Sequence, residues 1–185
     1  IIAYFQHIDS ENINYRGLHQ FDPESMEFAA GAKLHEIGQC NSCHFYGEEF
    51  PTGDAPTWAP NLALTKERLN AGWVTEWLRN PGAIMPGTKM PAPYVPDTEI
   101  LSLEGAEGDW GKALVAINGD TTAMLDGLRD YLWDIKGPTN IDALIKAYFA
   151  ENGYDFDSES GSDYEDDGWD DDGDDWGDED EDDDW

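Results

Sequence analysis

Five consecutive residues carry the clearest chemical signal in the chain. Cys40, Asn41, Ser42, Cys43 and His44 form a C-x-x-C-H motif. Two thiols three positions apart at a helix end can add to the two vinyl groups of one haem, and the adjacent imidazole can bind the iron from one side. The motif therefore predicts one covalent haem c, tethered by Cys40 and Cys43 and ligated by His44.

Two other uses of a cysteine pair fit the surrounding sequence less well. A thioredoxin-like pair follows a strand and opens a helix, whereas here a helix is predicted before the motif and a polar loop after it. A zinc site would need two more ligands at close spacing, and the chain has no third cysteine. The remaining histidines are not suitably clustered: His7, His19 and His35.

A proline-dense loop downstream offers a second iron ligand. It holds five of the chain's ten prolines and two methionines, Met85 and Met90. Proline leaves the backbone little freedom to lose, so the loop can hold a side chain in place at low entropic cost. A Met thioether opposite a His gives low-spin iron and raises its potential. Core packing is the other common use of Met, but a Met between a Gly-Thr-Lys turn and a proline suits ligation better.

Helical periodicity predicts the elements that position these residues. The four predicted helices cover about residues 22–37, 66–79, 121–136 and 140–151. The first is expected to be capped by Asp22 with Pro23 at its first position. Residues 97–119 are expected to be an irregular insertion with a helical turn near 110–117. No strand signal of comparable length is present, so the predicted class is all-α.

Together these motifs resemble those of class I (mitochondrial-type) cytochrome c domains. The resemblance spans about residues 22–136 and implies helices packed around one haem c. It rests on the C-x-x-C-H motif, three further segments and a set of helix-packing residues. These are Ala59-Pro60-Asn61-Leu62, Asn80-Pro81, Pro86-Gly87-Thr88-Lys89-Met90, and Gly31 with Leu128 and Tyr131.

The resemblance also implies roles for single residues. Met90 rather than Met85 becomes the distal iron ligand. The Pro60 carbonyl accepts a hydrogen bond from His44, which fixes the imidazole tautomer and makes it a stronger donor. Two further residues are expected in the site: Trp77 beside the Met sulfur, and Thr88 near a haem propionate.

Some positions depart from the family. Leu69 stands where mitochondrial members have a propionate-binding Trp, so that role either passes to Trp73 or is absent. Met85 stands where the family has an aliphatic packing residue. The lysine ring with which mitochondrial members dock to their oxidases is missing, so partner identity does not carry over.

Other aromatic and histidine residues have simpler expected roles. Five tryptophans are expected to line the core and the haem pocket: Trp58, Trp73, Trp77, Trp110 and Trp133. His35 is expected on the surface of its helix or in packing beside it, whereas His7 and His19 are expected in contact with solvent.

Charge divides the chain into two parts. The 185 residues carry a net charge of −31. Residues 1–150 hold 21 acidic and 10 basic residues, net −11, and residues 151–185 hold 20 acidic and none basic. A nucleic-acid binder is excluded because Lys/Arg clusters are absent. A membrane-spanning helix is also excluded, because the chain has no apolar run of about 18 residues.

The predicted organisation is a leader over 1–21, a cytochrome c domain over 22–137, an extra helix over 138–152 and an acidic tail over 153–185. Residues 1–5 share four identities with residues 145–149, so the leader is a candidate end of a preceding similar unit. The tail is expected to be disordered in isolation. It serves either solubility or binding to a basic partner surface, with Trp169, Trp176 and Trp185 as anchors; no EF-hand pattern supports a calcium site.

These expectations describe an electron carrier outside the cytoplasm. By the family resemblance it has no substrate chemistry and is periplasmic or on the external face of a bacterial membrane. It would exchange electrons with other redox proteins as a subunit or tethered domain of a respiratory or photosynthetic complex. Two alternatives stay open: a peroxidase-like haem enzyme with a labile Met90, and a scaffold subunit that acts through the tail.

Overall fold

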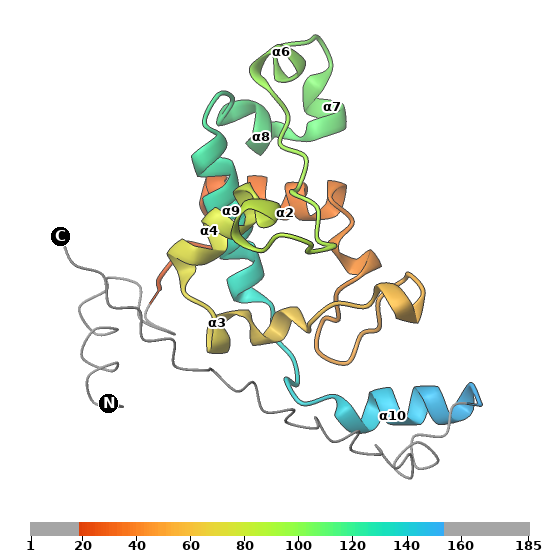
Figure 1. The fold of residues 1–185 in the computed structure, drawn as a ribbon. Helices are drawn as coiled ribbons and strands as arrows, with labels where there is room; N and C mark the ends of the chain where they lie inside the picture. The colour runs from red at the N-terminus through yellow and green to blue at the C-terminus, as the bar shows by residue number, and fades with distance from the viewer. Residues whose placement is uncertain (1–18, 154–185) are drawn as a thin grey trace, which may run out of the picture. The chain divides into compact units, whose positions relative to one another are not determined.

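The computed structural model describes residues 19–153, which form helices and connecting turns without any strand. The prediction of an all-α protein is confirmed for these residues. The α-helices are shown in Figure 1. They are α2 (Met26–Ile37), α3 (Thr65–Arg68), α4 (Ala71–Arg79), α5 (Pro81–Ile84), α6 (Thr98–Leu101), α7 (Ala106–Trp110), α8 (Lys112–Ala116), α9 (Thr121–Asp134) and α10 (Asp142–Glu151). Three short 3₁₀ helices accompany them: η1 (Cys40–Ser42), η2 (Ala55–Thr57) and η3 (Leu62–Leu64).

The first described helix starts later than the sequence predicts. Ser25 is the N-cap of α2, and its hydroxyl accepts a hydrogen bond from the Phe28 N–H at 3.1 Å. Asp22 instead accepts from the Glu24 N–H at 2.9 Å and closes a turn before the helix. The prediction that Asp22 and Pro23 begin this helix is wrong, because a second capping residue follows within one turn.

The helix predicted over 66–79 is two helices. After α3, Leu69 takes an extended conformation (φ −113°, ψ 163°) and the chain restarts as α4. The Asn70 side chain accepts hydrogen bonds from two backbone N–H groups in the first turn of α4, at 3.0 and 3.3 Å. An Asn that caps a new helix competes with continuation of the old one, which explains the break.

Two glycines allow α2 and α9 to cross with their backbones in contact (Figure 1). A Cβ on Gly31 would lie 2.0 Å from the carbonyl oxygen of Gly127, and a Cβ on Gly127 would lie 1.9 Å from that of Glu27. No side chain fits at either position. The core surrounds this crossing and includes Ala30, Leu34, Val74, Leu78, Leu114, Met124, Leu125, Leu128 and Leu132, all buried.

The segment 97–119 contains three short helices rather than one helical turn. Asp97 caps α6 by accepting from the Ile100 N–H at 2.9 Å. Gly105 and Gly111 take positive φ angles of 87° and 82° at the starts of α7 and α8, which glycine adopts without strain. The turn predicted near 110–117 corresponds to α8. The expectation of a mostly irregular insertion is wrong, because Asp97, Gly105 and Gly111 each begin a short helix within it.

The last two helices lie close to their predicted limits. Asp120 caps α9 through the Ala123 N–H, and α9 ends at Asp134 because Ile135 is extended. By its contacts the chain divides into two compact units, Ile1–Leu144 and Ile145–Trp185. That boundary falls inside α10, so the predicted domain limits remain predictions. Among the described residues, no helix has the length and apolarity needed to cross a membrane.

Candidate functional site

The two cysteines lie on one tight turn directly after α2. Gln39 takes a left-handed conformation (φ 48°) and ends the helical path, and η1 begins at Cys40. The His44 N–H then donates to the Cys40 carbonyl at 3.0 Å. Both thiols are free and partly buried, and burial raises the pKa of Cys40. The turn therefore presents two free thiols and an imidazole from five consecutive residues.

His44 is fixed by the segment that follows η2. Its Nδ1 lies 2.7 Å from the carbonyl oxygen of Pro60. Because a carbonyl can only accept, Nδ1 carries the proton and Nε2 keeps its lone pair. Burial lowers the pKa of His44, and the hydrogen bond to Pro60 opposes this shift. The Ala59 N–H also donates to the Cys43 carbonyl at 2.8 Å, so backbone and side chain hold the imidazole together.

Asn61 holds the loop that follows His44 by hydrogen bonds of its side chain, a role that the sequence did not predict. Its amide NH₂ donates to the carbonyls of Gly47 and Pro138 at 3.2 and 3.0 Å, and its Oδ1 accepts from the Gly47 N–H at 3.0 Å. The side chain is buried, with 6% of its surface exposed. It ties the loop after His44 to the segment that follows α9. The only signal in the sequence was its place within the Ala-Pro-Asn-Leu segment.

Met90 is held by two neighbours from its own loop and from α4. The Trp77 Nε1–H donates to the Met90 sulfur at 2.9 Å, and the Thr88 hydroxyl oxygen accepts from the Met90 N–H at 3.2 Å. Met90 packs against the hydrophobic core while staying partly buried. Met85 is 57% exposed and does not pack in the core as the family pattern implied. The loop therefore positions one methionine and leaves the other in solvent.

Thr88 contacts the backbone of Met90, and its expected place near a propionate stays a prediction. Trp73 stacks on Trp77 with ring centroids 5.2 Å apart and is 39% exposed, so it lies at the surface rather than in the core. Its expected places in the haem pocket and near a propionate stay predictions. Of the other three tryptophans expected in the core or the pocket, Trp133 is buried in the core, Trp58 packs with Phe45 and Phe50, and Trp110 packs with Tyr94.

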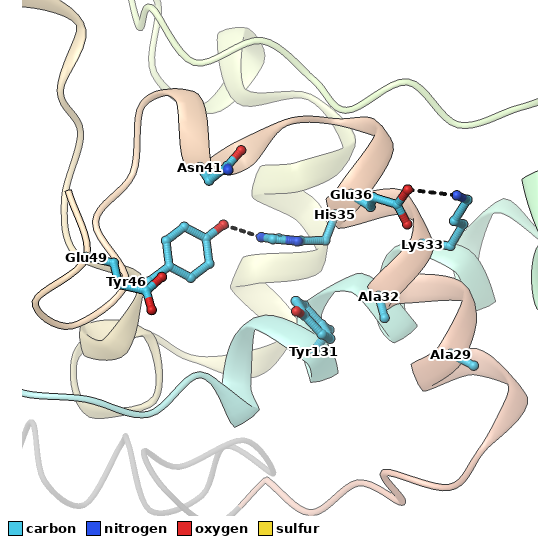
Figure 2. A pocket seen from close by; sticks show the side chains of 9 residues that line it. All are labelled: Ala29, Ala32, Lys33, His35, Glu36, Asn41, Tyr46, Glu49 and Tyr131. Carbon is cyan, nitrogen blue, oxygen red and sulfur yellow. Dashed lines mark hydrogen bonds and ion pairs between the residues drawn. The ribbon is translucent and has the colours of Figure 1, made fainter. Parts of the chain in front are cut away.

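His35 lines an open hollow beside the cysteine turn. The hollow has a volume of about 680 Å³. Figure 2 shows the Tyr46 hydroxyl directed at the His35 ring, to which it is hydrogen-bonded, with Tyr131 of α9 beside them. The His35 and Tyr131 ring centroids are 4.7 Å apart. Burial lowers the pKa of His35 and raises that of Tyr46. His35 is thus a packing residue, one of the two expected roles.

His19 is not in contact with solvent as expected. Its Nε2 lies 2.7 Å from Asp130 Oδ1, and both side chains are 14% exposed. Asp130 also accepts from Arg129, which in turn contacts Asp126 and Thr75. This network pins the chain before α2 onto α9 and α4. Only a structure reveals the pairing, because 111 residues separate His19 from Asp130. His7 lies outside the described residues.

The donor set of this region fits a haem c. Two thiols on one turn match the two vinyl groups, and a neutral imidazole with a free Nε2 is the form that ligates a metal. A thioether held by an N–H donor would supply a soft second ligand. By their chemistry, the residues that could hold such a group are Cys40, Cys43, His44 and Met90. Among residues 19–153 no three His, Cys, Asp or Glu side chains gather as a metal-binding cluster.

Comparison with known proteins gives one relative. Over 98 residues the chain is 32% identical to cytochrome c oxidase subunit 2 of Bacillus subtilis (strain 168). The match covers 49% of this chain and 26% of that protein, so the chain spans about a quarter of the relative's length. No protein-family model matches the chain, and no solved structure matches it at comparable significance.

Proposed function

We propose that this chain is an electron-transfer domain that carries one covalent haem c in a class I cytochrome c fold. The observation that carries the proposal is the 2.7 Å contact between His44 Nδ1 and the Pro60 carbonyl. It leaves Nε2 available next to the two thiols of Cys40 and Cys43. The helix crossing at Gly31 and Gly127 supports the same fold, because the family resemblance includes Gly31 at this crossing.

Each residue of the proposed site has a separate role. Cys40 and Cys43 tether the group, which when bound changes reversibly between Fe(III) and Fe(II). His44 and Met90 bind its metal, and two fixed hydrogen bonds keep these ligands in place in both oxidation states. Such rigidity keeps reorganisation small, as fast electron exchange requires. Trp77 also withdraws electron density from the Met90 sulfur, which favours the reduced state.

The relative supports a respiratory setting. It is named as a subunit of the enzyme that oxidises cytochrome c. We therefore place this domain in, or attached to, a respiratory complex on the extracytoplasmic side of a bacterial membrane. Its partners would be other redox proteins. The acidic segment 153–185, which beyond Gly153 lies outside the described residues, would contact a basic surface through its 19 acidic side chains.

A spectroelectrochemical titration tests this function. The chain is produced in the periplasm of a host that attaches haem c, and its absorption is followed while the potential is stepped in both directions. We expect one reversible one-electron change and, in the oxidised form, the far-red band of a methionine bound to ferric haem. A bound haem that reacts with peroxide and lacks this band would favour the peroxidase-like alternative. A haem without reversible reduction would favour the scaffold alternative.

A further inference from the structure

We propose that the stacked pair Trp73 and Trp77 is the contact through which a positively charged redox partner exchanges electrons with the Met90 side of the site. This inference rests on the proposed function and adds to it a route and a kind of partner. It starts from three groups that touch in sequence. Trp73 is at the surface, Trp77 lies between, and the Met90 sulfur lies innermost.

The contacts along this route are tight. The two indole rings are nearly parallel, with an interplanar angle of 14° and centroids 5.2 Å apart. The inner ring then donates its Nε1–H to the Met90 sulfur at 2.9 Å. Tunnelling falls off steeply across empty gaps, so a path of stacked rings and a hydrogen bond is favourable. The pair thus joins the solvent to the sulfur through direct contacts only.

The position of Trp73 is set by the backbone. Asn70 caps α4 and accepts from the Trp73 N–H at 3.3 Å, which fixes the first turn of the helix. Trp73 and Trp77 are four residues apart and therefore share one helix face. Even so, 39% of Trp73 stays exposed. A large ring held rigidly at the surface suits a partner contact, since Trp is strongly enriched among residues that anchor interfaces.

The net charge of the domain indicates the kind of partner. Beside the pair the charge is balanced, because Glu76 is ion-paired with Arg79 at 3.5 Å. Residues 1–150 as a whole carry a net charge of −11. A partner with a basic rim around an apolar centre would therefore be steered to this domain, where the exposed indole offers the apolar contact. In the exchange one electron leaves the partner, which is oxidised, and reduces the site by one electron; no bond forms or breaks.

The experiment measures reduction of the haem-loaded chain by photoexcited tris(bipyridine)ruthenium(II). This probe is a dication with flat aromatic ligands, so it combines the charge and shape expected of the partner. The variants are Trp73→Ala and Trp73→Phe, with Tyr94→Ala as the matched control. Tyr94 is also an exposed ring, at 52%, paired with a tryptophan, Trp110. For each protein the second-order rate constant, the midpoint potential and the absorption spectrum are recorded.

We expect Trp73→Ala to lower the rate constant about tenfold, the size of effect typical of truncating an anchoring aromatic. Trp73→Phe should restore most of the rate, and Tyr94→Ala should leave it unchanged. The potential and the spectrum should stay as in the wild type throughout. Equal rates in Trp73→Ala and wild type would overturn the route.

A change of potential large enough to account for the rate would also overturn the proposal, because Trp73 would then act on the haem rather than on the partner. Failure of the underlying function looks different: the wild type would then bind no haem, or its haem would not be reduced reversibly.

Discussion

At the scale of single residues, His44 shows how the chain holds an imidazole in the form that can bind a metal. The Pro60 carbonyl accepts a hydrogen bond from the Nδ1–H, which keeps the proton on Nδ1 and leaves Nε2 free in the neutral ring. Burial lowers the pKa of His44 and so favours this neutral form. The types and spacing of Cys40, Cys43 and His44 predict haem attachment, which stays a prediction. The family resemblance predicted the Pro60 contact. Neither indicated Asn61, whose importance comes from burial and from partners far apart in the sequence.

The two loop methionines give a first prediction. Met90 is hydrogen-bonded through its sulfur and partly buried, whereas Met85 is 57% exposed. Replacing Met90 with Leu should lower the midpoint potential and abolish the far-red ferric band, because the thioether ligand is lost. Met85→Leu is the matched control and should change neither. The opposite pattern, with loss in Met85→Leu alone, would show that the ligand assignment is wrong.

His35 gives a prediction on pH. Burial lowers its pKa below its ordinary value of 6.5, so below about pH 6.5 the unfolded chain binds more protons at this residue than the folded chain does. The free energy of unfolding should therefore fall as the pH drops from 7 to 5. His35→Gln cannot titrate, so its loss over this range should be smaller. Denaturant titrations at several pH values measure this, and an equally steep loss in the variant would contradict it.

At the scale of elements, helix caps set the helix limits that apolar periodicity did not predict. Apolar spacing predicted where helical segments lie, and α9 and α10 follow it closely. It could not predict the break before α4 or the three short helices within 97–119. Those features depend on a side-chain cap at Asn70 and on glycine conformations at Gly105 and Gly111. Local hydrogen bonds outweigh a periodic pattern over such short stretches.

The crossing of α2 and α9 gives the sharpest prediction on stability. Replacing Gly31 with Ala would put a Cβ 2.0 Å from the Gly127 carbonyl. Backbone cannot move aside as a side chain can, so the cost should exceed about 3 kcal/mol, the upper part of the usual range for overpacking. Gly108→Ala is the control, because nothing lies within 4 Å of its Cβ. Denaturant midpoints measure both, and a mild effect at Gly31 would show that the helices cross differently.

At the scale of the whole molecule, the charge of −31 has two sources. A net −11 belongs to residues 1–150, and the remainder belongs to the segment from 151 onward. Composition predicted this division, whereas a partner's identity depends on a surface that is not part of this chain. The relative suggests a respiratory setting, but the match covers only 26% of the relative's length.

The acidic segment gives the prediction at this scale. Deleting residues 154–185 should leave the midpoint potential unchanged, because the proposed haem ligands all lie within 40–90. It should weaken association with a basic redox partner at low salt and flatten the salt dependence of that association. Binding isotherms of full-length and truncated chains against cationic cytochrome c at several ionic strengths measure this. Identical salt dependence would show that the segment does not contact a basic surface.

The intact mass of the purified chain tests the central claim most directly. After production in a periplasm that attaches haem c, and after denaturation to remove any loosely bound group, the wild type should weigh one haem more than its sequence. The double variant Cys40→Ala, Cys43→Ala should show the mass of the polypeptide alone. A wild-type chain that retains two free thiols and no added mass under the same conditions would contradict the account.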